Sequence, residues 1–310
     1  MKVIFLGTPD FACACLESII KSKHQVVGVV CQPDKPSGRG NKLCPPPTKI
    51  LANKHNIPVF QFNKIRLEGV EILKSLNADI MVTAAYGQIL SQEIIDICPH
   101  KIINVHGSLL PKYRGASPIQ AAILNGDTKT GITIMETEIG VDTGDIMLME
   151  EIDIVDDDTY GSLTEKLAVL GSKLIVEALD KIEDGTITKT PQNHKLATHT
   201  KMIKKDQELL DFNDTAENLV NKVRAYNPNP IARFCIGVDG FKVYGLKAVK
   251  TAENGLNGQI LSANPKQGLV VKCNNGAVEV IELQAPNGKR MLAKSYLNGK
   301  KIEVGTIING

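Results

Sequence analysis

The sequence predicts an α/β fold in which a mostly parallel, Rossmann-like sheet domain is followed by a small antiparallel β-barrel domain. Its first 31 residues run from an apolar strand through a turn and a helix to a second apolar strand, the order of a right-handed parallel βαβ unit. From Ala232 onward, short alternating runs are separated by glycine turns, several of them Asn-Gly, as in antiparallel strands. Residues 1–189 contain 19 Lys and Arg and 24 Asp and Glu, so the front part is acidic. Residues 190–310 contain 17 Lys and Arg and 10 Asp and Glu, so the back part is basic.

Composition places the chain among globular proteins. With 310 residues, of which 43% are hydrophobic and 23% charged, it can bury one or two ample cores. No apolar run approaches the roughly 20 residues of a membrane span. The seven cysteines include no C-x-x-C pair, so we interpret them as reduced thiols of a cytoplasmic protein. The six histidines show no H-E-x-x-H spacing, so we expect no bound metal.

We expect three parts along the chain: a front domain over residues 1–189, a polar and basic linker over 190–208, and the barrel over 209–310. The front domain opens with strands over 2–6 and 25–31, and Asp10 can cap the helix between them. The turn before that helix lacks the glycines of the G-x-G-x-x-G fingerprint, so we exclude a dinucleotide site.

The remaining elements follow from apolar periodicity and from turn residues. Gly185 is expected to close a long helix that starts at Thr159 and has one apolar face. Strands are expected over 58–60, 79–84, 130–135 and 145–149, and helices over 48–54, 66–76, 159–183 and 215–226 and from Ser91 and Pro118 onward.

The stretch 32–47 is rich in Pro and Gly, which predicts a long loop. Glycines flank Arg39, and a guanidinium on a mobile loop could insert among phosphates. A flexible surface loop with an incidental arginine explains the same residues. The positive back half is equally open to two interpretations, a polyanion partner or a lysine-rich face that keeps the protein in solution.

The candidate site begins at Asn104 and His106, which follow a buried apolar run. Ligands of parallel sheets bind beyond the carboxyl ends of the strands, and residues two apart on a strand point the same way. Asp142 lies in a loop flanked by Gly140 and Gly144 and could reach the same crevice. An amide that donates to an oxyanion, an imidazole that moves protons and a carboxylate that orients it suit acyl transfer to an amine. The alternative is a turn cap, a satisfied buried histidine and an Asx turn.

The motif Asn104-Val-His-Gly-Ser-Leu-Leu-Pro111, with Asp142-Thr-Gly-Asp145 downstream, resembles the signature of the 10-formyltetrahydrofolate-dependent formyltransferases. The stretch 108–120 most resembles the members that formylate a charged initiator tRNA. Further similar stretches at residues 7–12, 32–40 and 84–90 extend the resemblance over nearly the whole chain.

The resemblance implies a site, a formyl donor and a partner. It implies that 10-formyltetrahydrofolate is the formyl-donor cosubstrate, that no metal is needed, and that the barrel is OB-like and contacts tRNA. It is also consistent with a monomer that has no membrane partner. The residues implied as catalytic are Asn104, His106 and Asp142; those implied to bind tetrahydrofolate are Tyr86, Gln88, Ser108, Leu109, Leu110 and Pro111; and those implied to bind tRNA are Arg39, Lys42, Lys204 and Lys205.

The chain differs from the formyltransferase pattern in two respects, and two alternative functions stay open. The chain has no Trp, and Asn229 stands where some relatives would have an aromatic residue. Since the barrel has no run of aromatic residues, we expect its tRNA contacts to be directed at phosphates and sensitive to salt. The alternative functions are a formyltransferase for a small amine, such as an amino sugar nucleotide, and a non-catalytic RNA-binding relative.

Overall fold

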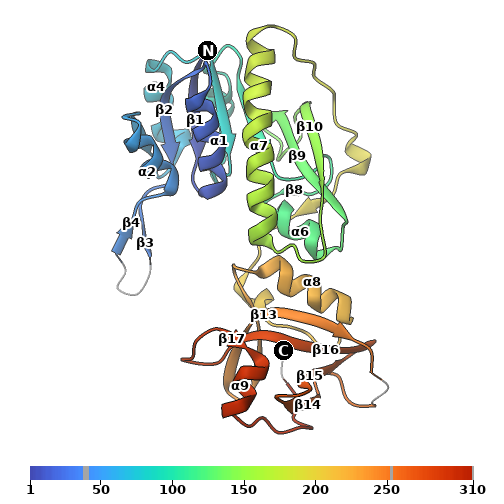
Figure 1. Cartoon of the computed structure of the whole chain (residues 1–310). Helices are drawn as coiled ribbons and strands as arrows, with labels where there is room; N and C mark the ends of the chain where they lie inside the picture. The colour runs from blue at the N-terminus through green and yellow to red at the C-terminus, as the bar shows by residue number, and fades with distance from the viewer. Residues whose placement is uncertain (38–41, 252–253, 309–310) are drawn as a thin grey trace. The chain divides into compact units, whose positions relative to one another are not determined.

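The computed structural model describes residues 1–37, 42–251 and 254–308, and the chain forms two compact units (Figure 1). The first unit contains residues 1–118, 129–152 and 164–200. The second contains residues 119–128, 153–163 and the chain from residue 201 onward. The two units therefore interleave along the sequence.

A seven-stranded sheet forms the centre of the first unit. Strands β1, β2, β5, β6 and β7 pair in parallel, and β9 is antiparallel to β7, so the prediction of a mostly parallel sheet is confirmed. The central strands are apolar along their whole length because both faces of the sheet are covered. In spatial order the strands are β10 (Ile146–Asp153), β9 (Lys129–Glu136), β7 (Ile102–His106), β6 (Ile80–Ala84), β1 (Lys2–Gly7), β2 (Gln25–Cys31) and β5 (Val59–Gln61).

Helices follow the strands, with two differences from the sequence-based expectation. Asp10 is the first helical residue and not the cap, which is Pro9. The helix expected over 66–76 is broken at Gly69, a poor helix former whose backbone packs closely on Ile65. The helices are α1 (Asp10–Lys21), α2 (Pro47–Lys54), α3 (Ile65–Glu68), α4 (Val70–Ser75), α5 (Gln92–Ile95), α6 (Pro118–Leu124) and α7 (Tyr160–Glu183).

The loop predicted over residues 32–47 is partly wrong, because its described part forms a hairpin. Strands β3 (Lys35–Ser37) and β4 (Lys42–Cys44) pair in antiparallel fashion. At the base of the hairpin, Asp34 accepts hydrogen bonds from Gln61 and Lys49 at 2.8 and 2.9 Å. These two contacts lower the pKa of the Asp34 carboxyl group.

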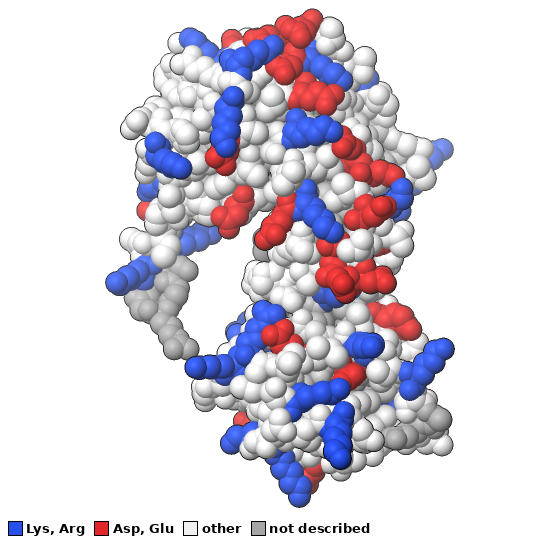
Figure 2. Space-filling view, in the orientation of Figure 1, with Lys and Arg blue, Asp and Glu red and all other residues white. Residues whose placement is uncertain are grey.

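The second unit is built on an antiparallel sheet, which confirms the predicted antiparallel β domain. Its core includes the stacked rings of Phe234 and Phe241, with centroids 5.3 Å apart, and Phe212 at the edge of Phe234. Figure 2 shows many Lys and Arg side chains on this unit. Its elements are β12 (Ala232–Ile236), β13 (Asp239–Val249), β16 (Gly276–Gln284), β15 (Gly268–Cys273) and β14 (Ile260–Asn264) in spatial order, with β17 (Met291–Leu292) on β16, and the helices α8 (Ala216–Tyr226) and α9 (Ala293–Gly299).

No helix among the described residues is long and apolar enough to cross a membrane. The first unit also contains the short strands β8 (Arg114–Gly115) and β11 (His199–Thr200), which pair with each other, and the 3-10 helix η1 (His194–Leu196). The 3-10 helix η2 (Lys205–Glu208) belongs to the second unit.

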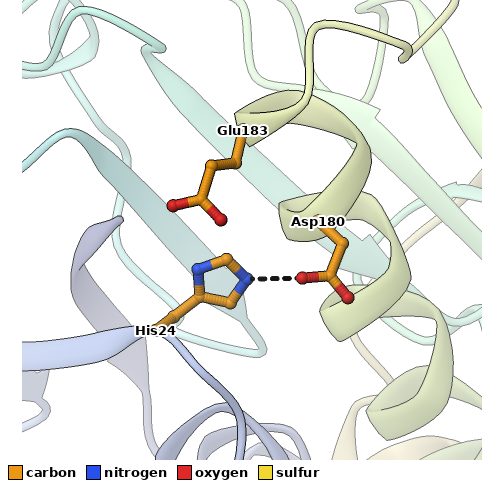
Figure 3. A group of neighbouring side chains, drawn as sticks. All are labelled: His24, Asp180 and Glu183. Atoms are coloured by element: carbon orange, nitrogen blue, oxygen red, sulfur yellow. Dashed lines mark ion pairs between the residues drawn. The ribbon is translucent and has the colours of Figure 1, made fainter.

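A charged cluster joins the start of β2 to the end of α7 (Figure 3). The ring of His24 is buried, and its Nε2 lies 3.2 Å from Asp180 Oδ1. Lys23 Nζ lies 3.1 Å from Asp180 and 3.0 Å from Glu183. Hydrogen bonds from the amino group of Met1 and from Lys23 lower the pKa of Glu183 to about 2. His24, Asp180 and Glu183 are spaced closely enough to hold a metal ion, but ammonium groups already pair with both carboxylates.

Candidate active site

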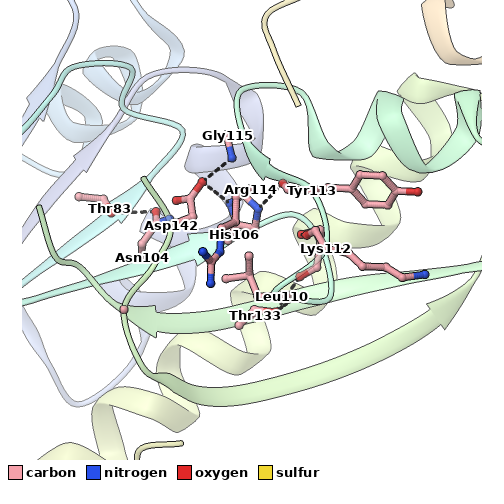
Figure 4. A network of polar contacts seen from close by, with 12 residues as sticks. Thr83, Asn104, His106, Leu110, Lys112, Tyr113, Arg114, Gly115, Thr133 and Asp142 are labelled. Atoms are coloured by element: carbon pink, nitrogen blue, oxygen red, sulfur yellow. Dashed lines mark hydrogen bonds and ion pairs between the residues drawn. The ribbon is translucent and has the colours of Figure 1, made fainter. Parts of the chain in front are cut away.

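The site begins where β6 and β7 end side by side (Figure 4). Thr83 and Asn104 are direct neighbours in the parallel register, and Thr83 Oγ1 donates to Asn104 Oδ1 at 2.8 Å. This bond fixes the side-chain amide with its oxygen toward β6. Within the part of the chain that the structure describes, the Asn104 NH₂ group has no protein acceptor.

His106 ends β7 and is held by the turn that follows. Its Nε2 lies 3.1 Å from the carbonyl oxygen of Tyr113. A carbonyl can only accept, so Nε2 carries the ring proton and donates it there. Nδ1 lies 3.6 Å from Asp142 Oδ2, which is too long for a direct hydrogen bond but close enough for electrostatic attraction. Nδ1 is therefore the ring nitrogen that can exchange a proton.

Asp142 reaches the histidine from the loop between β9 and β10. Its backbone is left-handed, with φ of +51°, and its Oδ2 accepts a 2.7 Å hydrogen bond from the Gly115 N–H. Gly144 of the same loop has no room for a side chain, because a Cβ there would lie 1.9 Å from the carbonyl oxygen of Glu136. The fold thus brings Asn104, His106 and Asp142 together at one edge of the sheet (Figure 4).

The turn that contains Ser108 to Pro111 is fixed to β9. Thr133 Oγ1 donates to the carbonyl of Ser108 at 2.7 Å and accepts from the N–H of Leu110 at 3.1 Å. Ser108 Oγ donates to the carbonyl of Lys112 at 2.6 Å. The side chain of Leu109 packs against Gly131, Leu110 is buried, and Pro111 is partly exposed. A backbone held at so many points can present itself to a flat ligand without reorganisation.

Tyr86 and Gln88 follow β6 and differ in their contacts. The amide of Gln88 accepts from the N–H of Ile65 at 2.9 Å and donates to the carbonyl of Phe62 at 2.8 Å, so it ties the segment after β6 to the start of α3. Tyr86 is buried in the core of the first unit, which raises the pKa of its phenol, and its hydroxyl has no hydrogen-bond partner among the described residues. A buried hydroxyl without a partner can be satisfied by a polar ligand, which is compatible with folate binding here, and the assignment of these residues to the folate stays a prediction.

The residues predicted to bind tRNA are spread over both units. Arg39 lies outside the described residues. Lys42 is exposed at the start of β4 in the first unit. Lys204 and Lys205 are exposed at η2 in the second unit. All three described lysines are thus accessible to phosphates.

Several residues that build the site were missed by sequence reasoning. Thr83 is the one polar residue of β6, and a hydroxyl within a buried strand is a signal that could have pointed to it. Tyr113 and Gly115 act through backbone atoms, which a sequence does not distinguish. Gln192 binds the backbone of Asp142 from 50 residues away, and no local pattern marks it.

Comparison with known families gives the class of protein: two family models of formyl transferases match this chain. The family model described as "Formyl transferase" matches residues 1–179, and the one described as "Formyl transferase, C-terminal domain" matches residues 202–301. The chain belongs to the formyl transferase family.

Two relatives are similar to this chain over almost its full length. A methionyl-tRNA formyltransferase of Sulfurihydrogenibium sp. (strain YO3AOP1) is 47% identical over 307 residues, covering 98% of this chain and 99% of the relative. One from Kosmotoga olearia is 44% identical, covering 100% of both.

Solved structures share the fold. An N-formyltransferase from Helicobacter canadensis, in complex with folinic acid and dTDP-3-aminofucose, matches with a TM-score of 0.67 at 18% identity, covering 90% of this chain and 99% of that one. HypX from Aquifex aeolicus in complex with tetrahydrofolic acid matches at 0.64 and 15% identity, covering 99% of this chain and 50% of that one.

Proposed function

We propose that this chain transfers the formyl group of 10-formyltetrahydrofolate to the α-amino group of methionyl-tRNA, giving formylmethionyl initiator tRNA for translation initiation. The observation that carries the proposal is the similarity, end to end, to proteins named methionyl-tRNA formyltransferase. The joint position of Asn104, His106 and Asp142 supports it with a site suited to the chemistry.

The cosubstrate supplies a formyl group on a nitrogen that can leave. Asn104 would donate its free N–H groups to the carbonyl oxygen as negative charge develops there. His106 would take the proton of the attacking amine at Nδ1 and return it toward the leaving nitrogen. Asp142 would orient the ring and stabilise its charged form. Tyr86, Gln88 and the turn of residues 108–111 would hold the folate in position for the attack. Because the amine attacks the formyl carbon directly, the reaction needs no nucleophile from the protein.

We further propose that basic residues bind the tRNA backbone. Arg39 and Lys42 belong to the segment around the β3–β4 hairpin, and Lys204 and Lys205 lie at η2. Arginine and lysine side chains that contact phosphates give binding that weakens steeply with salt. Exchanging Arg39 for Ala should raise the KM for the charged tRNA and reduce the slope of log KM against log salt concentration by about one unit. We also propose that the protein is cytoplasmic and monomeric.

A formyl-transfer assay with three acceptors tests the function. Charged initiator tRNA, charged elongator tRNA and a free amino sugar nucleotide should be compared at equal concentration. The expected result is turnover with the charged initiator tRNA and little with the sugar. Equal rates with the small amine would reject the tRNA substrate in favour of small-molecule formylation.

A further inference from the structure

We infer that Gln192 is a positioning residue for the catalytic carboxylate, which it serves by tying the Asp142 loop to the β8 turn. The inference rests on the proposed function, because it assigns Gln192 a role that acts through Asp142. Gln192, Asp142 and the residues that join them all belong to the first unit.

The amide of Gln192 is buried and uses its whole hydrogen-bonding capacity. Nε2 donates to the carbonyl oxygens of Asp142 and Gly144, at 2.9 and 2.7 Å. Oε1 accepts from Nε and Nη2 of Arg114, at 3.1 and 2.7 Å. The opposite orientation of the amide would set its NH₂ group against the guanidinium and its oxygen against two carbonyls, so the chemistry of its neighbours fixes its direction.

These bonds close a ring around the carboxylate. Arg114 directly precedes Gly115, whose N–H holds Asp142 Oδ2 at 2.7 Å. Asp142 therefore accepts hydrogen bonds at two places: its main-chain carbonyl accepts from Gln192, and its side chain accepts from Gly115. Arg114 is 3% exposed, and in the described part of the chain its guanidinium bonds to Gln192 and to His194 Nδ1 at 3.1 Å, with no carboxylate among its partners.

The loop needs such a tie because its conformation is unfavourable by itself. A left-handed backbone at a residue other than glycine is strained and persists only where surrounding contacts hold it. Without the two bonds from Nε2, Asp142 can relax, and its carboxylate moves relative to His106 Nδ1. A displacement of about 1 Å in a catalytic constellation can lower the rate by about 100-fold.

The substitution Gln192→Glu tests the inference with little change in shape. A carboxylate still accepts from Arg114, which favours folding, but it cannot donate to the two carbonyls. We expect kcat to fall about 10- to 100-fold, while the KM for 10-formyltetrahydrofolate changes less than about threefold. A loss confined to KM, or turnover equal to that of the unchanged protein, would overturn the inference.

A double-mutant cycle with Asp142→Asn separates positioning from a general structural role. If Gln192 acts through Asp142, the double variant should turn over as slowly as Asp142→Asn alone. Multiplying losses would overturn the inference. If Asp142→Asn alone keeps full turnover, the proposed role of Asp142 fails instead, which is a distinguishable result.

Gln284→Glu is the matched control. Gln284 also accepts from a side chain, the Tyr244 hydroxyl at 3.0 Å, and donates to a backbone carbonyl, that of Gly288 at 2.9 Å, but it belongs to the second unit. It should leave kcat unchanged. Thermal unfolding checks that each variant is folded. If Gln192→Glu does not fold, Gln192→Asn replaces it, because it keeps the amide but shortens its reach. The double variant with Asp142→Asn should then again turn over as slowly as Asp142→Asn alone.

Discussion

Replacing Asn104 by Ala should lower kcat by about 100- to 1,000-fold. The structure supports a value in this range because the amide is already oriented: Thr83 donates to its oxygen at 2.8 Å, and its NH₂ group has no acceptor among the described residues. Removing one preorganised donor to an oxyanion costs about 2.7–4 kcal/mol, which corresponds to that range of rates. Thr83→Val removes the orienting bond but keeps the donor, so we expect a smaller loss of about tenfold, for a neutral hydrogen bond of about 1–1.5 kcal/mol.

Single-turnover formylation of charged initiator tRNA at saturating 10-formyltetrahydrofolate measures both effects without interference from product release. Asn53→Ala is the control, because Asn53 is an exposed residue of α2. In the Asn104→Ala background, Thr83→Val should have no further effect. A fall of less than about threefold for Asn104→Ala in a folded protein would refute the assignment of this amide as the oxyanion donor.

Three further predictions concern stability and reactivity. Burial alone would raise the pKa of Glu136, but hydrogen bonds from Lys189 and Lys101 lower it. Glu136→Gln should therefore lower the unfolding free energy by about 1–3 kcal/mol at pH 7. Denaturant titrations should show this difference shrinking as the pH falls below 4.5, where Glu136 becomes protonated. Tyr86→Phe should leave the unfolding free energy of the ligand-free protein unchanged or raise it by up to about 1 kcal/mol, because it removes a buried hydroxyl that has no partner among the described residues; a clear loss of stability would contradict this. A maleimide should label exposed Cys44 first and Cys15 last, since burial raises the pKa of the Cys15 thiol to about 12, as mass spectrometry of a time course can check.

Local patterns were sufficient for most elements of the fold. The apolar run before Asn104 and the run over residues 79–84 are buried strands, β7 and β6, as predicted. The β3–β4 hairpin was missed because Pro and Gly weaken the strand signal, and pairing between residues 35–37 and 42–44 compensates for it only in the folded chain. The break at Gly69 was missed because a single glycine lowers helix propensity without showing that the helix is interrupted there.

The candidate site divides in the same way. The spacing of Asn104 and His106 predicts two polar side chains at one strand end, because alternation along a strand is a local property. Asp142 comes within 3.6 Å of the imidazole because its own backbone is left-handed. An Asp in a glycine-flanked turn can adopt this conformation, but the sequence does not predict that it will. Gln192 joins Arg114 across 78 residues and gives no sign of this in its surrounding sequence.

The sequence by itself determined the fold class, the chemical types in the candidate site and the charge contrast between the two halves, because periodicity, composition and residue chemistry belong to short stretches of chain. Only the tertiary structure decided which backbone groups hold the catalytic candidates, which nitrogen of His106 can exchange a proton, and that a distant glutamine grips the Asp142 loop. Such distances arise when separate segments pack at native density, and no single segment contains the information that sets them.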